Sequence, residues 1–530
     1  MAVTPWLEPS ELRVGLGCMR LDADAFEQVV GPAAEAGITV FDTARAYEGN
    51  EYSLARAVRA CGAGATARIV TKGGMARPEG AWVADGRAKA IRGDSEASLA
   101  ALDGLPIDLY LLHAPDPRTP WRTSVRALAR LADEGLVRRV GLSNVNRTQL
   151  DEALELAPVA AVQVALSPFD DRALRGGIVE RCDELGIALI AHSPLGGPKR
   201  AARVDAEETL AWLLGLSRVV VPIPGARRPE TVRSSARAAV TAPAPKPYRP
   251  NRASVTPRSD AEIVLVMGIP GAGKSRIAAS YTARDYLRLN RDERGGSLRE
   301  LAGALDEALA SAARHVVLDN TYLTRAARND VLAVAGRHRV AARCIWLDTP
   351  LAQAQVNLVE RLLERYGSLP PPDELRELAK REQGVLVPTS QMRAARELEP
   401  PSADEGFLAV ERVAFEREPA NGVAGVFVAA AAVDAVPPGH RSEPHLVFDW
   451  SDDDIGPAAA RIDAAVVETA RCPHGGGPPA CWCRPPLPGL PLAFARTHGV
   501  NPARSLLVGS SPAHRTLAAT LGARFVAIGG

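Results

Sequence analysis

The chain has 530 residues, of which 46% are hydrophobic and 24% charged, the usual composition of a globular protein. At roughly 150 residues per domain, this length predicts about three or four domains. The formal net charge of +1 excludes an overall field that would attract nucleic acid or a membrane surface, so any polyanion site must be local.

The distribution of cysteines and of apolar residues indicates the cellular compartment. Three of the seven cysteines fall between residues 472 and 483, and the other four are scattered singly. This distribution is not a disulfide framework and indicates a reducing environment. No apolar segment typical of a leader opens the sequence, and no long apolar run suggests a membrane span. We therefore expect a cytoplasmic location and no membrane partner.

Residues 1–240 alternate short apolar runs with amphipathic stretches. Eight runs are predicted to be strands: "RVGLG", "ITVFDTA", "RIVTKG", "IDLYLLHA", "RRVGLSN", "AVQVALS", "ALIAHSP" and "RVVVPIPG". Eight strands alternating with helices predict a (β/α)8 TIM barrel. The runs are apolar throughout, as expected for parallel strands buried on both faces.

Polar side chains follow several of these strands. Asp42, Lys72 and His113 each end a strand, and Tyr47 lies in the loop after one. Such positions form the catalytic face of a barrel. We expect Lys72 to pair with Asp42 and to lower the pKa of Tyr47, which then gives a proton to a carbonyl oxygen while His113 orients the substrate.

These residues resemble the aldo-keto reductases from about Leu12 to Val240, with support from "GLSNV" and "VPIPGARRPE". The resemblance implies carbonyl reduction with NADPH as cofactor. It implies Arg227 or Arg228 as the contact to the 2'-phosphate. The residues that it places at the cofactor also include Ser143, Asn144 and Gln163.

The barrel departs from that family in three places. His192 stands where a Tyr usually stacks under the nicotinamide, and Ser235 replaces an expected Asn. Residues 196–216 are far fewer than the family's segment, which carries the loop over the cofactor pyrophosphate. Two interpretations stay open, an active reductase and a recruited scaffold or sensor domain.

Residues 241–260 are rich in Pro, Ser and Arg and are predicted to be a linker. Strand and helix alternate again in residues 261–416, which predicts a doubly wound sheet. "GIPGAGKS" fits the P-loop pattern between a strand and a helix. Gly268, Gly271 and Gly273 let backbone N–H groups wrap the phosphates of ATP. Lys274 would reach the β- and γ-phosphates, and Ser275 would ligate Mg²⁺.

Asp292 in "LRLNRDERGG" ends a predicted strand on the phosphate side of the sheet, where a carboxylate can deprotonate an attacking hydroxyl. "LNRD", "VVLDNTYLTRAAR" and "ELEPPSADEGFLAVERVAF" resemble the kinase domain of polynucleotide 5'-kinases, from about Glu262 to Phe415. The resemblance implies that Asp292 is the general base on a 5'-hydroxyl, and that Asp319 and Thr321 lie at the nucleotide.

The same resemblance implies a lid arginine on the ATP phosphates, either Arg361 or Arg365. Some members of the family place an arginine for the acceptor phosphate three residues after the base, where this chain has Gly295. The alternative is a P-loop kinase that acts on a small metabolite. Local positive charge favours a polyanion and comes from Arg284, Arg288, Arg291, Arg294 and Arg299.

In residues 417–530, four zinc-type ligands stand on one short loop: Cys472, His474, Cys481 and Cys483. Four protein ligands fill a tetrahedral site, so we expect structural Zn²⁺. "CPH…CWCRPPLPG" resembles the zinc loop of haloacid-dehalogenase-type (HAD-like) phosphatases, from about Gly425 to Gly530. Pro485 replaces the family's phosphate-binding Lys, and Ser510 replaces an Asp that ligates magnesium. No D-x-D nucleophile motif precedes the loop, so we expect no phosphatase activity.

Three hypotheses follow. In the first, the chain is an ATP-dependent kinase of 5'-hydroxyl RNA or DNA ends, working beside a repair ligase or phosphatase. In the second, the barrel is the working enzyme, an NADPH-dependent reductase, and the kinase part regulates it. In the third, all three domains are a scaffold for repair partners.

Overall fold

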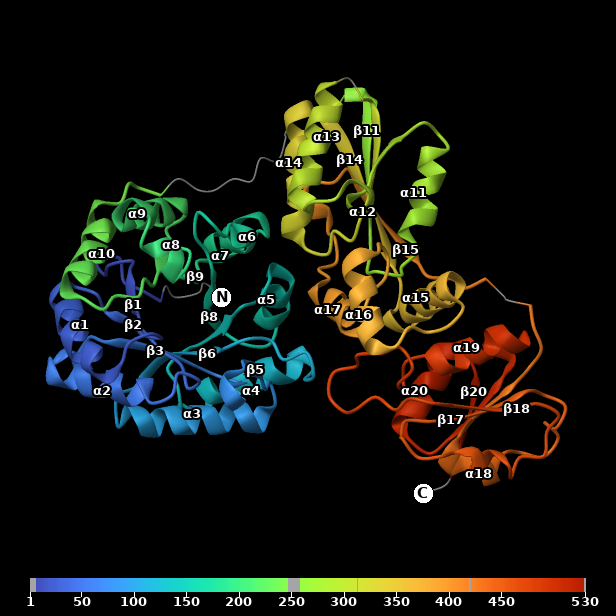
Figure 1. Ribbon diagram of the computed structural model, residues 1–530. Helices are drawn as coiled ribbons and strands as arrows, with labels where there is room; N and C mark the ends of the chain where they lie inside the picture. The colour runs from blue at the N-terminus through green and yellow to red at the C-terminus, as the bar shows by residue number, and fades with distance from the viewer. Residues whose placement is uncertain (1–5, 246–257, 312, 419–420, 529–530) are drawn as a thin grey trace. The chain divides into compact units, whose positions relative to one another are not determined.

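The computed structural model describes residues 6–245, 258–311, 313–418 and 421–528. The chain divides into two compact units, Met1–Arg252 and Ala253–Gly530 (Figure 1). Most of the predicted linker lies outside the described residues. Helix α10 (Pro229–Thr241) ends where the linker was expected to begin, and strand β11 (Arg258–Met267) includes the last three residues of the expected linker. Among the described residues, no helix is long and apolar enough to cross a membrane.

The first unit is a nearly closed barrel of eight parallel strands, as predicted. Strands β1 and β10 at the two ends of the sheet are joined by the Gly17 amide, which donates to Pro224 O at 3.0 Å. A Cβ on Gly17 would lie 2.8 Å from Ile223 O, so the two ends approach this closely only with glycine there. In spatial order the strands are β1 (Gly15–Gly17), β2 (Val40–Asp42), β3 (Arg68–Gly73), β6 (Ile107–Leu112), β7 (Val140–Ser143), β8 (Val159–Ala165), β9 (Ala188–His192) and β10 (Val220–Pro222).

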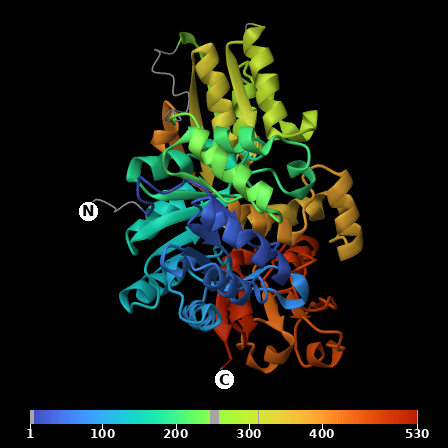
Figure 2. The ribbon, with the colours of Figure 1, turned by 90° about the vertical axis from the view of Figure 1, so that its left-hand side faces the viewer.

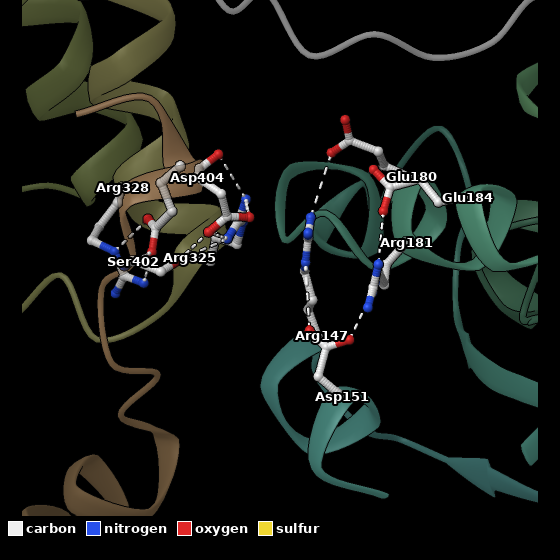
Figure 3. Close-up of polar contacts among 10 residues, drawn as sticks. Arg147, Asp151, Glu180, Arg181, Glu184, Arg325, Arg328, Ser402 and Asp404 are labelled. Atoms are coloured by element: carbon white, nitrogen blue, oxygen red, sulfur yellow. Dashed lines mark hydrogen bonds and ion pairs between the residues drawn. The ribbon is translucent and has the colours of Figure 1, made fainter. Parts of the chain in front are cut away.

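Helices cover the outside of the barrel (Figure 1), and in Figure 2 the blue and green helices of this unit lie in front of its strands. Several of these helices begin with a side-chain N-cap: Asp22, Asn146 and Asp205 each accept a hydrogen bond from a backbone N–H of the first turn. Arg181 ties two helices, donating to Asp151 at 2.7 Å (Figure 3). The helices are α1 (Ala23–Glu35), α2 (Asn50–Ala60), α3 (Ala88–Leu102), α4 (Trp121–Asp133), α5 (Arg147–Leu154), α6 (Arg172–Arg175), α7 (Ile178–Leu185), α8 (Pro198–Ala201), α9 (Ala206–Leu216) and α10; a hairpin adds β4 (Met75–Ala76) and β5 (Val83–Ala84).

The second unit begins with a parallel sheet in the order β12-β13-β11-β14-β15. Its central strand β11 is followed directly by the P-loop, as predicted. Strand β15 was not predicted, because it is an edge strand with little buried surface. The elements are β12 (Leu287–Leu289), β13 (His315–Asp319), β14 (Val340–Asp348), β15 (Ala409–Ala414), α11 (Lys274–Thr282), α12 (Arg291–Arg294), α13 (Leu298–Ala310), α14 (Arg325–His338), α15 (Leu351–Tyr366), α16 (Pro372–Arg381) and α17 (Pro388–Glu397).

A buried ion pair fixes the "DEGF" segment to α14 of this sheet. Arg328, which is fully buried, donates from two nitrogens to Glu405, each at 2.7 Å. Beside it Arg325 pairs with Asp404 at 3.0 Å and donates to Ser402 at 3.2 Å (Figure 3). The segment that leads into β15 is therefore held to α14 by charge.

A second parallel sheet follows, in the order β18-β17-β16-β19-β20. Strand β18 was not predicted, because "VETAR" is polar and half exposed at the sheet edge. The elements are β16 (Val426–Ala429), β17 (His445–Asp449), β18 (Val467–Arg471), β19 (Leu506–Gly509), β20 (Arg524–Ala527), α18 (Gly456–Ala459), α19 (Gly489–His498) and α20 (Pro512–Leu521). One buried cluster contains Leu362 and Leu363 of α15 together with Phe427 of β16 and Leu492 of α19, so a helix beside the first sheet shares a core with the second sheet.

Candidate active sites and metal site

The barrel places a buried charge pair at the carboxyl ends of its strands. Lys72, which is 1% exposed, donates to Asp42 at 2.7 Å and to Thr43 O at 2.8 Å. Gln163 donates to the other carboxylate oxygen of Asp42, also at 2.7 Å. Burial lowers the pKa of Lys72, but Asp42 and Tyr47 raise it by more, so the net direction is upward. Lys72 is therefore held as a cation.

Tyr47 lies beside this pair, with its ring centroid 5.2 Å from Lys72 Nζ. The expectation that Lys72 lowers the pKa of Tyr47 is wrong in net direction. Burial raises the pKa of Tyr47 by more than the positive charge of Lys72 lowers it. The phenol thus keeps its proton in the free protein, which is the state that a proton donor requires.

His113 completes the group. Its ring meets the Tyr47 ring edge to face at 5.8 Å and the Trp82 ring at 5.7 Å. Burial, with Lys72 and His192 nearby, lowers the pKa of His113 to about 3, so the imidazole is neutral. Its Nδ1 is buried without a hydrogen-bond partner among the described residues.

Asp42, Tyr47 and His113 line a cavity of about 560 Å³. Ser143, Asn144 and Gln163, which the resemblance places at the cofactor, line it as well, together with His192. Asn144 has a positive φ of 57° and donates to His113 O at 3.0 Å, so a strained backbone is held against the site. Its Oδ1 lies 3.3 Å from His192 Nε2.

Neither predicted 2'-phosphate residue lines this cavity. Arg227 donates to Arg20 O at 2.9 Å, and Arg228 precedes the first turn of α10. Residues after β9, including Gly197 and Pro198, form part of the cavity wall. The short segment between residues 196 and 216 thus still reaches the site.

In the second unit, the P-loop follows β11 and opens α11. Gly268, Gly271 and Gly273 have φ values of 152°, 87° and 92°, which L side chains rarely adopt. A Cβ on Gly271 would lie 2.4 Å from Ala354 O of α15, so glycine is required there by contact as well. Asn357 donates to Gly271 O at 2.8 Å, which fixes the loop to α15. Sequence reasoning missed this amide.

Lys274 folds back over the loop, donating to Gly268 O and Ile269 O, both at 3.0 Å. Burial lowers the pKa of Lys274 to about 8, although Asp319 and Asp292 act to raise it. A phosphate group would supply the missing negative charge. Lys274 and Ser275 line a cavity of about 550 Å³.

The same cavity collects both acidic residues that the resemblance implied. Asp292 lies in the first turn of α12, just after β12, and its amide donates to Asn290 Oδ1 at 2.7 Å. Asp319 ends β13 and accepts from Arg288 at 2.5 Å and from Asn290 at 3.2 Å. Thr321 lines the cavity too. Two strand ends therefore converge on the P-loop.

Geometry distinguishes the two lid arginines. Arg361 lines the cavity and lies close enough to Lys274 to lower its pKa. Arg365 does not line it and instead pairs with Glu382 at 2.5 Å. Residues 379–386, hereafter the wall segment, form one side of the cavity and were not predicted at the site.

A second cavity of about 320 Å³ lies next to the first, and both are lined by Gly273 and Arg276. Its other lining residues include Thr349 and Asn357 and the segment 413–418 after β15. Asn357 Oδ1 accepts from Arg417 at 2.7 Å, which holds that segment against α15. A ligand bound to the P-loop thus has room on two sides.

Four cysteine and histidine side chains meet on the loop after β18, as predicted. The ligand atoms of Cys472, His474, Cys481 and Cys483 all lie within 4.8 Å of one another. Hydrogen bonds from the neighbouring thiols lower the pKa of Cys481. Arg484 donates to Gly475 O at 3.0 Å and to a second carbonyl of the loop. The donor set and spacing fit a tetrahedral Zn²⁺ ion.

No acidic residue directly follows the central strand of the second sheet. Its central strand β16 ends at Ala429 and is followed by further alanines. Ser510 follows β19, and its amide donates to His514 Nδ1 at 3.2 Å. Pro485 stands at the loop position where the resemblance expected a Lys.

Comparison with known proteins found two family matches along the chain. The model of the aldo/keto reductase family matches residues 13–209, and the model of an AAA domain matches residues 263–385. An uncharacterized oxidoreductase of Schizosaccharomyces pombe is 30% identical over 251 residues, which cover 43% of this chain and 81% of the relative.

Two solved structures are similar to part of this chain. A thermostable aldo-keto reductase in complex with the inhibitor epalrestat is 27% identical, and the match covers 43% of this chain and 89% of that one with a TM-score of 0.37. An aldo-keto reductase from Klebsiella pneumoniae, in complex with NADPH, is 24% identical, with coverages of 44% and 87% and a TM-score of 0.37. Through its amino-terminal barrel, the chain belongs to the aldo/keto reductase family.

Proposed function

We propose that the P-loop part of the second unit is an ATP-dependent kinase that phosphorylates the 5'-hydroxyl end of a polynucleotide. The observation that carries this proposal is the single cavity shared by Lys274, Ser275, Asp292 and Arg361. The cavity thus brings together the P-loop, the two cationic side chains Lys274 and Arg361, and the carboxylate of Asp292. These are the groups that phosphoryl transfer requires.

In the proposed reaction, Asp292 accepts the proton of the 5'-hydroxyl as its oxygen bonds to the γ-phosphorus. The bond from the γ-phosphorus to the bridging oxygen breaks, and ADP leaves. Lys274 and Arg361 stabilise the charge on the transferring group. Mg²⁺, which Ser275 would hold, would neutralise the phosphate oxygens. The adjoining cavity at Thr349 and segment 413–418 offers space for the nucleoside.

Charge at the cavity supports a polyanionic acceptor, although not all the predicted arginines contribute. Arg288 is occupied by Asp319 and Glu293, and Arg284 stacks over the Tyr281 ring at 4.2 Å. Arg291 does line the cavity, as do Lys380 and Arg381 of the wall segment, which the sequence did not reveal. Lys380 also pairs with Glu377 at 2.7 Å. A small-metabolite acceptor is the competing interpretation.

The test uses labelled ATP with 5'-hydroxyl RNA and DNA oligonucleotides, and with the same oligonucleotides already phosphorylated. We expect label on the 5'-hydroxyl ends alone. Transfer to neither nucleic acid would refute the polynucleotide assignment, and transfer to a nucleoside or sugar instead would favour the small-metabolite kinase.

A second proposed function, carbonyl reduction by the barrel, is favoured by the group Asp42, Lys72, Tyr47 and His113. NADPH would supply the hydride. Tyr47, which keeps its proton, would donate to the carbonyl oxygen, and His113 would orient the substrate. Ser143, Asn144 and Gln163 would hold the nicotinamide end. A fluorescence titration with NADPH tests this; absence of binding would leave the barrel as a scaffold.

We further propose that the last part of the chain is a HAD-like domain that has lost phosphatase chemistry and keeps a structural zinc. Its strand order, with the first strand central, and its Cys/His loop support this. Phosphatase action of this type needs a carboxylate nucleophile, and alanines follow β16 instead. Metal analysis of the purified protein, together with a phosphatase assay, tests both parts.

A further inference from the structure

One buried side chain joins the Cys/His loop to the wall of the P-loop cavity. Trp482 stands between Cys481 and Cys483 and is 2% exposed. Its indole Nε1 donates to Leu386 O at 2.9 Å. Leu386 is the last residue of the wall segment, residues 379–386, which lines the same cavity as the P-loop.

Close packing reinforces this bond. Gly489, at the start of α19, donates from its amide to Trp482 O at 3.1 Å. A Cβ on Gly489 would lie 2.4 Å from Trp482 O and 2.7 Å from Leu369 Cδ1, in the connection between α15 and α16. Trp482 also shares its buried cluster with Leu375 of α16 and Val385 of the wall segment.

We propose that the Cys/His loop positions the wall segment, so that metal binding on the loop sets the affinity of the P-loop cavity for nucleotide. This inference rests on the proposed kinase function and on the proposed metal site. A metal ion held by Cys481 and Cys483 fixes the backbone on both sides of Trp482. Trp482 then holds Leu386, and with it Lys380 and Arg381, at the cavity. Trp482 touches no reacting atom and is a positioning residue.

The substitution Trp482→Phe tests the bond, because it keeps an aromatic ring in the core and removes only the indole N–H. We expect bound zinc to be unchanged and hydrogen exchange of the amides in residues 379–386 to rise about fivefold, the factor that corresponds to one lost buried hydrogen bond. The KM for ATP should rise by a similar factor while kcat stays near the wild-type value. Strand β11 serves as the internal reference for exchange.

Trp450→Phe is the matched control. Its indole Nε1 donates to His474 O at 2.7 Å, so this variant also loses an indole bond on the loop but leaves the contact to Leu386 intact. Exchange in the wall segment should stay at the wild-type rate. An equal rise in the two variants would overturn the proposal.

Removal of the metal from the wild-type protein by a chelator supplies the second arm. We expect the same rise of exchange in residues 379–386 relative to β11. Unchanged exchange there after the metal has left, or a purified protein that holds no metal, would overturn the coupling. The hydrogen-exchange measurements need no nucleotide. A protein that fails to phosphorylate any 5'-hydroxyl end would therefore refute the proposed kinase function, while hydrogen exchange would still test the coupling between the metal loop and the wall segment.

Discussion

The substitution Asp292→Asn isolates the proposed general base. Asparagine has the same shape, and the backbone amide of residue 292 keeps its bond to Asn290 Oδ1, so α12 should persist. The Asp292 side chain is 51% exposed and meets Arg291 only at 3.5 Å, so little folding energy depends on the carboxylate. Loss of the variant's activity would therefore report on chemistry rather than on unfolding.

Removing a general base lowers the rate by about 10²- to 10⁴-fold, or roughly 2.7–5.5 kcal/mol in activation free energy. Asp292 is also one of the two carboxylates that raise the pKa of Lys274 against burial. The variant should therefore lower that pKa below about 8. Transfer is best measured at about pH 6.5, where Lys274 stays protonated in both proteins.

The assay follows kcat for labelling of a 5'-hydroxyl oligonucleotide at saturating ATP, together with the dissociation constant for ATP. Glu293→Gln is the control, since Glu293 is the next residue of the same turn and pairs with Arg288 at 2.6 Å without lining the cavity. Its kcat should change by less than about fivefold. Unchanged transfer by Asp292→Asn, or an equal loss in both variants, would refute the assignment of the base.

Three further predictions concern buried charge. Because the pKa of Lys274 is about 8, the affinity for ATP measured by calorimetry should fall as pH rises through 8, by up to about tenfold per unit, and should not fall in Lys274→Met. The pKa of His113 is about 3 in the folded barrel against 6.5 when unfolded, so the unfolded chain takes up the proton first as pH falls. The free energy of unfolding should then decrease between pH 6.5 and 3 by up to about 1.4 kcal/mol per unit, and His113→Gln should flatten that slope in thermal melts. Arg328→Met leaves Glu405 buried without its partner and should cost about 3–5 kcal/mol in chemical denaturation, whereas adding Glu405→Leu should recover most of it.

Much of the fold could be predicted from local pattern. The eight barrel strands and the strand before the P-loop are continuous apolar runs between helical stretches, which parallel buried strands require. Strands β15 and β18 lie at sheet edges, where "AVERVA" and "VETAR" carry charge and leave no such run. Edge strands of this kind are specified by their neighbours more than by their own composition.

The candidate sites divide in the same way. Asp42 and Lys72 lie at the carboxyl ends of strands β2 and β3, and Asp292 comes shortly after β12. Because strand ends converge by topology, the assembly of these residues follows from their positions along the chain. The direction in which the pKa of Tyr47 shifts could not be predicted in this way, because it depends on how deeply the phenol is buried. Lys380 and Arg381 reach the cavity through a helical connection whose path the sequence does not specify.

The shared core of the second unit could not be predicted from the sequence. Leu362 and Leu363 of α15 have the pattern of a helix that buries one face. That pattern does not tell whether the face packs against a sheet of the same domain or of another domain. In the structure these residues belong to the same buried cluster as Trp482 and Leu492. A boundary near residue 416 therefore divides the motifs but not the packing. Residues 261–416 on their own would therefore expose their part of this cluster to water. We accordingly expect the isolated segment to lose ATP affinity even though it contains the whole P-loop cavity.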